Sequence, residues 1–287
     1  MAMRSITSVG LIIKRGHSQA LALGAVLAQW LRSRGLEILA EPEAAPQIDA
    51  VPLTKAQLAQ RADLIVVLGG DGTLLSIARF VGERETPILG VNLGGLGFLT
   101  QAPMDEARAS IERVLDGDYT LDRRITLEAS VISSDGNTGP ATVTALNDVV
   151  IHQRQLGRLL EVDVTADGQR FCSYRADGLI VSTPTGSTAY ALSAGGPIIF
   201  PTMEVVVLAP ICPHTLTNRP IVMPDSCMLE LRIDATDHDA VLTADGQEGI
   251  ALGASDRVLI SKGRSCVALV GSTHSYFEIW RNKLRWG

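Results

Sequence analysis

Uninterrupted apolar strands alternate with helical segments over the first part of the chain, and this alternation constrains the fold more than any other feature. The strand candidates are residues 9–14, 36–40, 63–68 and 87–92. Apolar residues recur at helical spacing over 19–34, 56–62 and 73–80. Strands that are apolar throughout are typical of a parallel sheet covered by helices on both faces. The proline-rich stretch 41–52 between them is expected to be a loop.

The sequence pattern changes after about Arg124, where β-branched residues and short strand patterns replace the helical patterns. Asp167-Gly168 stands between two such strands and is a signal for a tight hairpin. We therefore expect an α/β N-terminal domain with a parallel sheet (1–123) and a C-terminal all-β, sandwich-like domain (124–272). Residues 273–287 are expected to pack back on the N-terminal domain, with a terminal helix or strand cap over 275–285.

Composition argues against several classes of function. The formal net charge of −6 does not suit a basic nucleic-acid-binding surface, so no nucleic-acid partner is expected. The four cysteines contain no C-x-x-C pair and are expected to be free thiols of a cytoplasmic protein. Neither a signal peptide nor an apolar run long enough to span a bilayer is found, so no membrane partner is expected.

The stretch VVLGGDGTLLS (66–76) places one carboxylate, Asp71, inside a glycine cluster at the end of a buried strand. In α/β sheets this position lines the crevice where ligands bind, and glycines at a helix start favour phosphate. A carboxylate suits such a place if it accepts a proton from an attacking hydroxyl or acts through Mg²⁺. The alternative is an ordinary helix cap in a tight turn. Neither a P-loop nor a G-x-G-x-x-G motif occurs.

Three further stretches carry candidate binding residues. The cluster VNLGGLGFLT (91–100) follows the next strand and is expected to line the same crevice, unless it is only a glycine-rich exit from that strand. In YRADGLIVSTPTGSTAYALSAGGPI (174–198), hydroxyls and an aromatic ring gather at a helix start, which suits a sugar, a phosphate or a base. In TALNDVVIH (144–152), an amide and a carboxylate interrupt an apolar strand, which indicates a ligand contact or a solvated edge.

Taken together and in order, GGDGT (69–73), GGLGF (94–98), Asn147-Asp148 and RADGLIVSTPTGSTAYALSAGGP (175–197) resemble the NAD kinases. DGQ (245–247) and SYF (275–277) resemble the bacterial members, and the resemblance covers nearly the whole chain. It implies that ATP phosphorylates the 2′-hydroxyl of the adenosine ribose of NAD to make NADP, with NAD bound between the two domains. It also implies that Mg²⁺ accompanies ATP and that Asp71 is the catalytic proton acceptor.

The resemblance assigns binding roles to residues that match the family's motifs. It implies ATP phosphate contacts at Gly69, Gly70, Gly72 and Thr73. It implies NAD contacts at Asp71, Gly72, Phe98, Asn147, Asp148, Arg158, Arg175, Asp177, Thr188, Ala189, Tyr190, Ser193 and Gln247. No residue is predicted to bind the metal directly. Many members have Asn-Glu where this chain has Asn147-Asp148, and the family implies a homodimer or homotetramer.

Two other functions compete with this interpretation. Lipid kinases share GGDGT, but they tend to carry a glutamate after a second Asp-Gly, where this chain has Gln247. The segment TPTGSTAY and the lack of an amphipathic membrane-binding stretch also argue against a lipid kinase. A non-catalytic NAD(P) sensor is the second alternative, and the carboxylate of Asp71 argues against it because a sensor does not need one.

Overall fold

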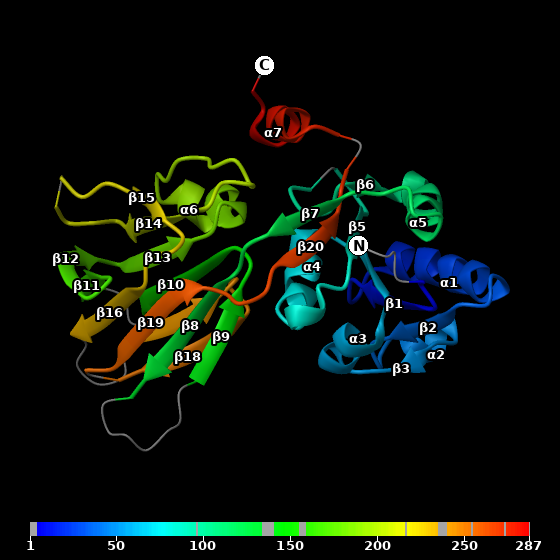
Figure 1. The fold of residues 1–287 in the computed structure, drawn as a ribbon, viewed down its shortest axis with the longest axis horizontal. Helices are drawn as coiled ribbons and strands as arrows, with labels where there is room; N and C mark the ends of the chain where they lie inside the picture. The colour runs from blue at the N-terminus through cyan, green and yellow to red at the C-terminus, as the bar shows by residue number, and fades with distance from the viewer. Residues whose placement is uncertain are drawn as a thin grey trace. The chain divides into compact units, whose positions relative to one another are not determined.

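The computed structural model describes residues 5–286 except 96, 134–140, 155–158, 216, 235–239, 254 and 273. The chain divides into two compact units. Unit 1 comprises residues 1–123 and 267–287, and unit 2 comprises residues 124–266. Figure 1 shows both, with unit 1 in blue to green for residues 1–123 and orange to red for residues 267–287, and unit 2 in green to orange.

Unit 1 is built on a sheet whose strands follow the order β3-β2-β1-β4-β5-β20-β7, with β6 beside β5. The strands β2 and β4 flank β1, and both run parallel to it. Strand β5 continues the parallel pairing beyond β4. The strands are β1 (Ser8–Ile13), β2 (Glu37–Ala40), β3 (Val51–Pro52), β4 (Leu64–Leu68), β5 (Ile88–Asn92), β6 (Ala102–Pro103), β7 (Leu121–Arg124) and β20 (Val267–Val270).

Helices cover both faces of this sheet, as its apolar strands predicted. Helices α1 and α5 share one core with Val9 and Leu11 of β1. Helix α3 lies against the other face, where a Cβ added at Gly10 would sit 2.4 Å from Leu58 Cδ2. The helices are α1 (Ser18–Ser33), α2 (Ala45–Ile48), α3 (Lys55–Arg61), α4 (Asp71–Ala78), α5 (Ala107–Leu115) and α7 (Tyr276–Leu284), with 3-10 turns η1 (Gly82–Arg84) and η2 (Met104–Glu106).

Local sequence signals account for most of these boundaries. Thr54 and Ser275 each form a reciprocal capping box with the residue three positions on, which starts α3 and α7. The expectation that 41–52 is a loop is wrong, because this stretch holds α2 and β3. Proline stands in the first turn of α2, where its missing N–H would have no helical partner anyway.

Strand β20 belongs to unit 1, although residues 267–272 were expected in the β domain. It runs parallel to β5, with Leu269 opposite Ile88. Its composition resembles that of the sandwich strands, so only the long-range pairing distinguishes it. In the segment that follows, Tyr276 of α7 donates a hydrogen bond to Asp122 of β7.

Unit 2 is a sandwich of two antiparallel sheets. Their strand orders are β15-β14-β13-β10-β17-β18 and β12-β11-β16-β19-β8-β9. One apolar core joins them, with Leu179 and Leu208 from the first sheet and Val162 and Leu231 from the second. The predicted hairpin at Asp167-Gly168 is confirmed, since both residues have the left-handed φ values (48° and 76°) of a type I′ turn.

The bounds of the elements of unit 2 are as follows. The first sheet contains β10 (Asp148–Gln153), β13 (Gly178–Ser182), β14 (Val205–Ile211), β15 (Ile221–Pro224), β17 (Ala240–Ala244) and β18 (Glu248–Leu252). The second contains β8 (Leu127–Ile132), β9 (Ala141–Ala145), β11 (Leu160–Ala166), β12 (Gln169–Ala176), β16 (Leu229–Asp234) and β19 (Arg257–Lys262). The short turns η3 (Thr185–Thr188) and α6 (Tyr190–Ser193) follow β13. No helix among the described residues has the length and apolarity needed to cross a membrane.

Candidate active site

The GGDGT turn forms the corner between the buried strand β4 and helix α4, as predicted. Gly70 is the N-cap and Asp71 occupies the first turn of the helix. A Cβ added at Gly69 would lie 2.4 Å from Thr73 Oγ1, so packing requires glycine there. Gly70 and Gly72 meet nothing within 4 Å and have no left-handed φ. Neither packing nor backbone conformation therefore requires glycine at 70 or 72, and glycine at such a place leaves room for a ligand to approach the main chain.

The carboxylate of Asp71 is held by the second glycine cluster. Its Oδ1 accepts hydrogen bonds from the backbone N–H groups of Leu99 (3.0 Å) and Thr100 (2.9 Å) and from Thr100 Oγ1 (3.0 Å). Its Oδ2 accepts one from the N–H of Phe98 at 2.9 Å. The two glycine clusters are therefore in direct contact within unit 1, and their lining of one crevice stays a prediction. Because each carboxylate oxygen has about two lone-pair sites, Oδ2 can still accept another hydrogen bond.

Two residues outside the predicted set shape the loop that clamps Asp71. Asn92, at the end of β5, donates from Nδ2 to Thr100 Oγ1 (2.8 Å) and accepts at Oδ1 from the N–H of Gly94 (2.8 Å). The buried Thr100 in turn reaches Asp71. Gly97 fits against this cluster because a Cβ there would lie 2.4 Å from Asp71 Oδ1. A polar Asn at the end of an apolar strand was the available sequence signal for this role.

A cavity lies at the same edge of the sheet as the GGDGT turn, where β1 leads into α1. Its volume is about 470 Å³, and Lys14, Arg15 and His17 are among its lining residues. The neighbouring strands β1 and β4 end together, since the N–H of Lys14 donates to the carbonyl of Leu68 at 2.9 Å. The connections from β1 and β4 leave on opposite sides of the sheet order, and such switch points bind ligands in α/β proteins.

In unit 2, Asn147 lies where the chain passes from one sheet to the other. The expectation that TALNDVVIH is one continuous strand is wrong, because β9 ends at Ala145 and β10 begins in the facing sheet at Asp148. The Asp245 carboxylate stabilises this crossing by accepting from the N–H groups of Leu146 (2.9 Å), Asn147 (2.7 Å) and Asp148 (3.2 Å). A second crossing occurs at Asp177, between β12 and β13.

Asp245 reaches the crossing from a tight turn. Asp245 and Gly246 have left-handed φ values of 51° and 63°, and the N–H of Gln247 closes the turn on the carbonyl of Ala244 at 3.0 Å. An Asp-Gly pair between strands is the signature of this turn type, so the sequence held a signal for it. Gln247 itself is exposed.

The segment TPTGST packs against Asn147 from the other side. A Cβ at Gly186 would lie 2.2 Å from the carbonyl oxygen of Asn147, so only glycine fits. The expectation that the hydroxyls of this segment bind a ligand is wrong for two of them. Thr185 is buried and accepts from Arg124 Nη1 at 3.2 Å, while the buried Ser187 bonds to Pro184 and Ile199.

A cavity of about 750 Å³ in unit 2 collects part of the predicted NAD-binding set. The predicted residues that line it are Asn147, Asp148, Asp177, Ala189 and Tyr190. The Oδ1 atom of Asn147 is buried and has no hydrogen-bond partner in the described structure, so a ligand donor would satisfy it. Arg175, Thr188, Ser193 and Gln247 do not line this cavity. Arg158 lies outside the described residues.

Asp148 has a strongly perturbed carboxyl group. Burial, followed by the nearby charge of Asp245, raises the pKa of Asp148 to about 7, against the lowering effect of a hydrogen bond from the backbone of Tyr190. The side chain is only 5% exposed. Perturbed carboxyls in a cavity are typical of functional sites. Among the residues that the structure describes, no group of three His, Cys, Asp or Glu side chains could hold a metal ion.

An α/β unit with a glycine corner after a parallel strand, followed by a sandwich with a ligand-sized cavity, is typical of a two-domain nucleotide-binding protein. The family model of the ATP-NAD kinase N-terminal domain matches residues 9–119, and that of the C-terminal domain matches residues 146–272. The chain belongs to the NAD kinase family.

Individual relatives agree with this assignment. An NAD kinase from Syntrophotalea carbinolica is 44% identical over 97% of this chain and 98% of its own length. One from Solibacter usitatus is 40% identical over 99% of both. Yeast NADH kinase, solved with NADH, has a TM-score of 0.92 at 25% identity, covering 99% of this chain and 89% of its own. An Archaeoglobus fulgidus NAD kinase, solved with ATP, has a TM-score of 0.77 at 25% identity, covering 97% and 98%.

Proposed function

We propose that this chain transfers the terminal phosphoryl group of ATP to the 2′-hydroxyl of the adenosine ribose of NAD, with Asp71 as the proton acceptor. Membership of the NAD kinase family supports the reaction. The observation that carries the role of Asp71 is its clamp, in which four hydrogen bonds orient the carboxylate and Oδ2 keeps acceptor capacity. The P–O bond to the ribose forms as the bond to ADP breaks, and Asp71 takes the hydroxyl proton.

The donor site is proposed at the carboxyl edge of β1 and β4. Gly69, Gly70, Gly72 and Thr73 are the proposed phosphate contacts. Gly70 and Gly72 support this role because no atom lies within 4 Å of the place that a Cβ would take, and a helix start attracts phosphate oxygens. The cavity at the β1–α1 corner offers Lys14 and Arg15 on the adjoining strand end.

The acceptor site is proposed at the unit 2 cavity. Asn147 Oδ1 would accept a hydrogen bond from a hydroxyl or amide of NAD, and Asp148 would bind the ribose. The half-exposed ring of Tyr190 is available for stacking. Contacts of NAD with Gly72, Phe98, Arg158, Arg175, Asp177, Thr188, Ala189, Ser193 and Gln247 remain predictions.

Mg²⁺ is proposed to arrive with ATP and to neutralise charge on its phosphates. The chain's contribution would be indirect, since the donor set at the corner is backbone amides and a threonine rather than a carboxylate cluster. A homodimer or homotetramer in the cytoplasm also remains a prediction.

The test is an assay of purified protein with NAD, ATP and Mg²⁺, read by an NADP-specific dehydrogenase. We expect NADP formation by the wild type and loss of most turnover in Asp71→Asn, with NAD binding by calorimetry kept. Thr100→Val is the matched control, because it removes one clamp bond and leaves the carboxylate. Turnover of Asp71→Asn within a few-fold of wild type would refute the role of Asp71. If the wild-type protein bound NAD but formed no NADP, the chain would be an NAD(P) sensor. If the wild-type protein neither bound NAD nor formed NADP, lipid substrates would be tested next.

A further inference from the structure

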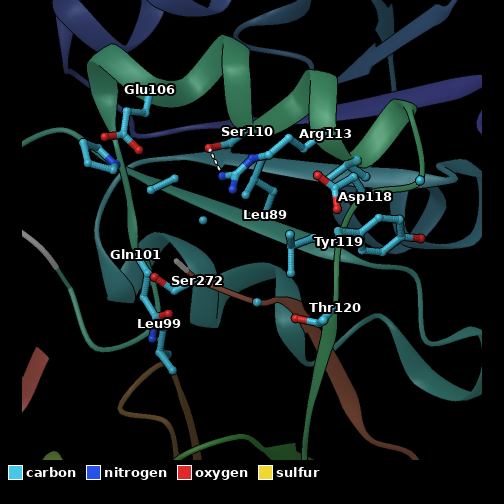
Figure 2. Close-up of a pocket in the computed structure, with 17 residues that line it drawn as sticks. Leu89, Leu99, Gln101, Glu106, Ser110, Arg113, Asp118, Tyr119, Thr120 and Ser272 are labelled. Carbon is cyan, nitrogen blue, oxygen red and sulfur yellow. Dashed lines mark hydrogen bonds between the residues drawn. The ribbon is translucent and has the colours of Figure 1, made fainter. Parts of the chain in front are cut away.

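A cavity of about 300 Å³ in unit 1 has no part in the function proposed above. It lies between α5 and the strands β5, β6 and β20 (Figure 2). Apolar side chains such as Leu89 and Val114 line it, together with polar groups that converge from several elements. At about 30 Å³ for each water-sized group, the volume holds about ten such groups, which suits a small metabolite rather than a dinucleotide.

Arg113 is the only cationic side chain among the residues that line this cavity in the described structure. It is half-buried, and its Nη2 donates to Oγ of the buried Ser110 at 3.2 Å (Figure 2). Within the described residues it forms no ion pair, whereas Arg108 on the same helix pairs with Glu112 at 3.3 Å. A guanidinium fork without a carboxylate partner is well suited to a carboxylate or phosphate ligand.

The carboxylates that line the cavity are both on exposed residues, Glu106 and Asp118. Glu106 precedes α5 and Asp118 follows it, so they lie on either side of Arg113 in Figure 2. They would repel a simple anion but accept hydrogen bonds from hydroxyl or ammonium groups. We propose that this cavity binds a small organic anion, whose carboxylate or phosphate monoester contacts Arg113 and whose hydroxyl or ammonium donors face Glu106 and Asp118.

The cavity is joined to the clamp of Asp71 by two residues. Gln101 lines the cavity and donates from Nε2 to the carbonyl of Phe98 at 2.8 Å. Leu99 also lines it, and its N–H donates to Asp71 Oδ1 at 3.0 Å. A ligand that contacts either residue restrains the segment that orients the carboxylate. The cavity is thus a regulatory site that acts on kcat, a consequence that rests on the proposed function.

Binding is tested by calorimetry with four probes at millimolar concentration: inorganic phosphate, glycerol 3-phosphate, glycerate and serine. Saturating ATP is present, so that the proposed donor site is occupied. We expect at least one probe to bind wild type and Arg108→Gln equally and Arg113→Gln about tenfold more weakly, the loss of one charge-assisted hydrogen-bonded contact. Arg113→Lys keeps the charge and loses the guanidinium fork, so its affinity for the probe should lie between those of wild type and Arg113→Gln. Absence of binding by all four probes, or equal binding to Arg113→Gln, overturns the site.

Regulation is tested with the probe that binds. We expect it to change kcat for NAD phosphorylation several-fold in wild type and Arg108→Gln, with no change in Arg113→Gln and little change in KM for NAD. A bound probe that leaves kcat unchanged overturns the coupling to Asp71. The calorimetric result does not depend on turnover, so failure of the kinase assignment and failure of this site are distinguishable.

Discussion

The carboxyl of Asp148 is buried beside the carboxylate of Asp245, whose own hydrogen bonds hold the backbone at residues 146–148. Burial and this charge raise the pKa of Asp148 to about 7. Two acidic side chains of unit 2 therefore act differently. Asp245 organises the backbone at the crossing between the sheets, and Asp148 changes its charge near neutral pH within the proposed NAD site.

The raised pKa of Asp148 predicts a pH-dependent stability. Below the unfolded pKa of 3.8 the carboxyl is protonated in both states and carries no penalty. As pH rises towards 7, only the unfolded state ionises freely, so the stability contributed by this group is progressively lost. The full penalty is about 4 kcal/mol at most. Asp148→Asn should therefore gain stability over wild type as pH rises from about 4 to 7 and keep a constant advantage above that, measured by urea denaturation.

The control for this prediction is Asp116→Asn, which changes an exposed aspartate after α5. Its stability relative to wild type should vary little over the same pH range. If Asp148→Asn behaved like this control, the buried carboxyl would not titrate in the folded state as described.

Gly70 and Gly72 predict that one substitution can raise the stability of the protein and impair its use of ATP at the same time. Gly72→Ala should stabilise α4 by up to about 1 kcal/mol, because alanine is the better helix former and its Cβ meets nothing within 4 Å. It should nevertheless raise KM for ATP, as should Gly70→Ala, because a methyl group would cover the backbone. Thermal denaturation and ATP-dependent kinetics check both effects.

Gly69→Ala is the matched contrast on the same turn. Its Cβ would lie 2.4 Å from Thr73 Oγ1, so we expect a lower melting temperature. An unchanged KM for ATP in both Gly70→Ala and Gly72→Ala would contradict the proposal that this backbone contacts the phosphates of ATP.

Gly97→Ala should disturb the orientation of Asp71 from within the clamp. The added Cβ would lie 2.4 Å from both Asp71 Oδ1 and Thr100 Oγ1, so the carboxylate must shift. Misplacement of a reacting group by about 1 Å costs about 10²-fold in rate, and we expect a fall of that size in kcat. Gly95→Ala, in the same loop but facing open space, should keep near wild-type kcat. Equal rates for the two variants would contradict the clamp.

Asp245→Asn should lower both the stability of unit 2 and the affinity for NAD. The amide keeps one acceptor oxygen for three backbone N–H groups, which we expect to cost about 1–3 kcal/mol in unfolding free energy. NAD affinity should fall because Asn147 and Asp148 lose their support. Urea denaturation and NAD calorimetry provide the two measurements.

The other Asp-Gly hairpin of unit 2 supplies the comparison for Asp245. Asp167 has the same left-handed conformation, but its carboxylate accepts from the exposed N–H of Met228 at 2.9 Å and from the Cys227 side chain, and no bond from it to a sheet crossing is described. Asp167→Asn should therefore change stability little and NAD affinity not at all. Comparable losses in the two variants would mean that Asp245 acts through its turn alone.

Local features of this protein could be predicted from the sequence alone. The run LIVVL followed by GGDGT specified a buried strand, a tight corner and a helix start, because each depends on neighbouring residues. The Asp167-Gly168 hairpin has the same local origin, as does the end of α1, where the left-handed Gly35 follows the C-cap Arg34. The motifs in their order also identified the family.

Only the tertiary structure decided which distant groups meet. The four donors to Asp71 come from residues nearly thirty positions away, and Asp245 supports residues 146–148 across about a hundred positions. The strand-like pattern of residues 144–152 could not reveal a break between two sheets, and that of 267–270 could not reveal its pairing with β5. Periodicity reports which residues are buried. It cannot report which distant strand or side chain a buried residue will contact, because that depends on packing and hydrogen bonding summed over the whole fold.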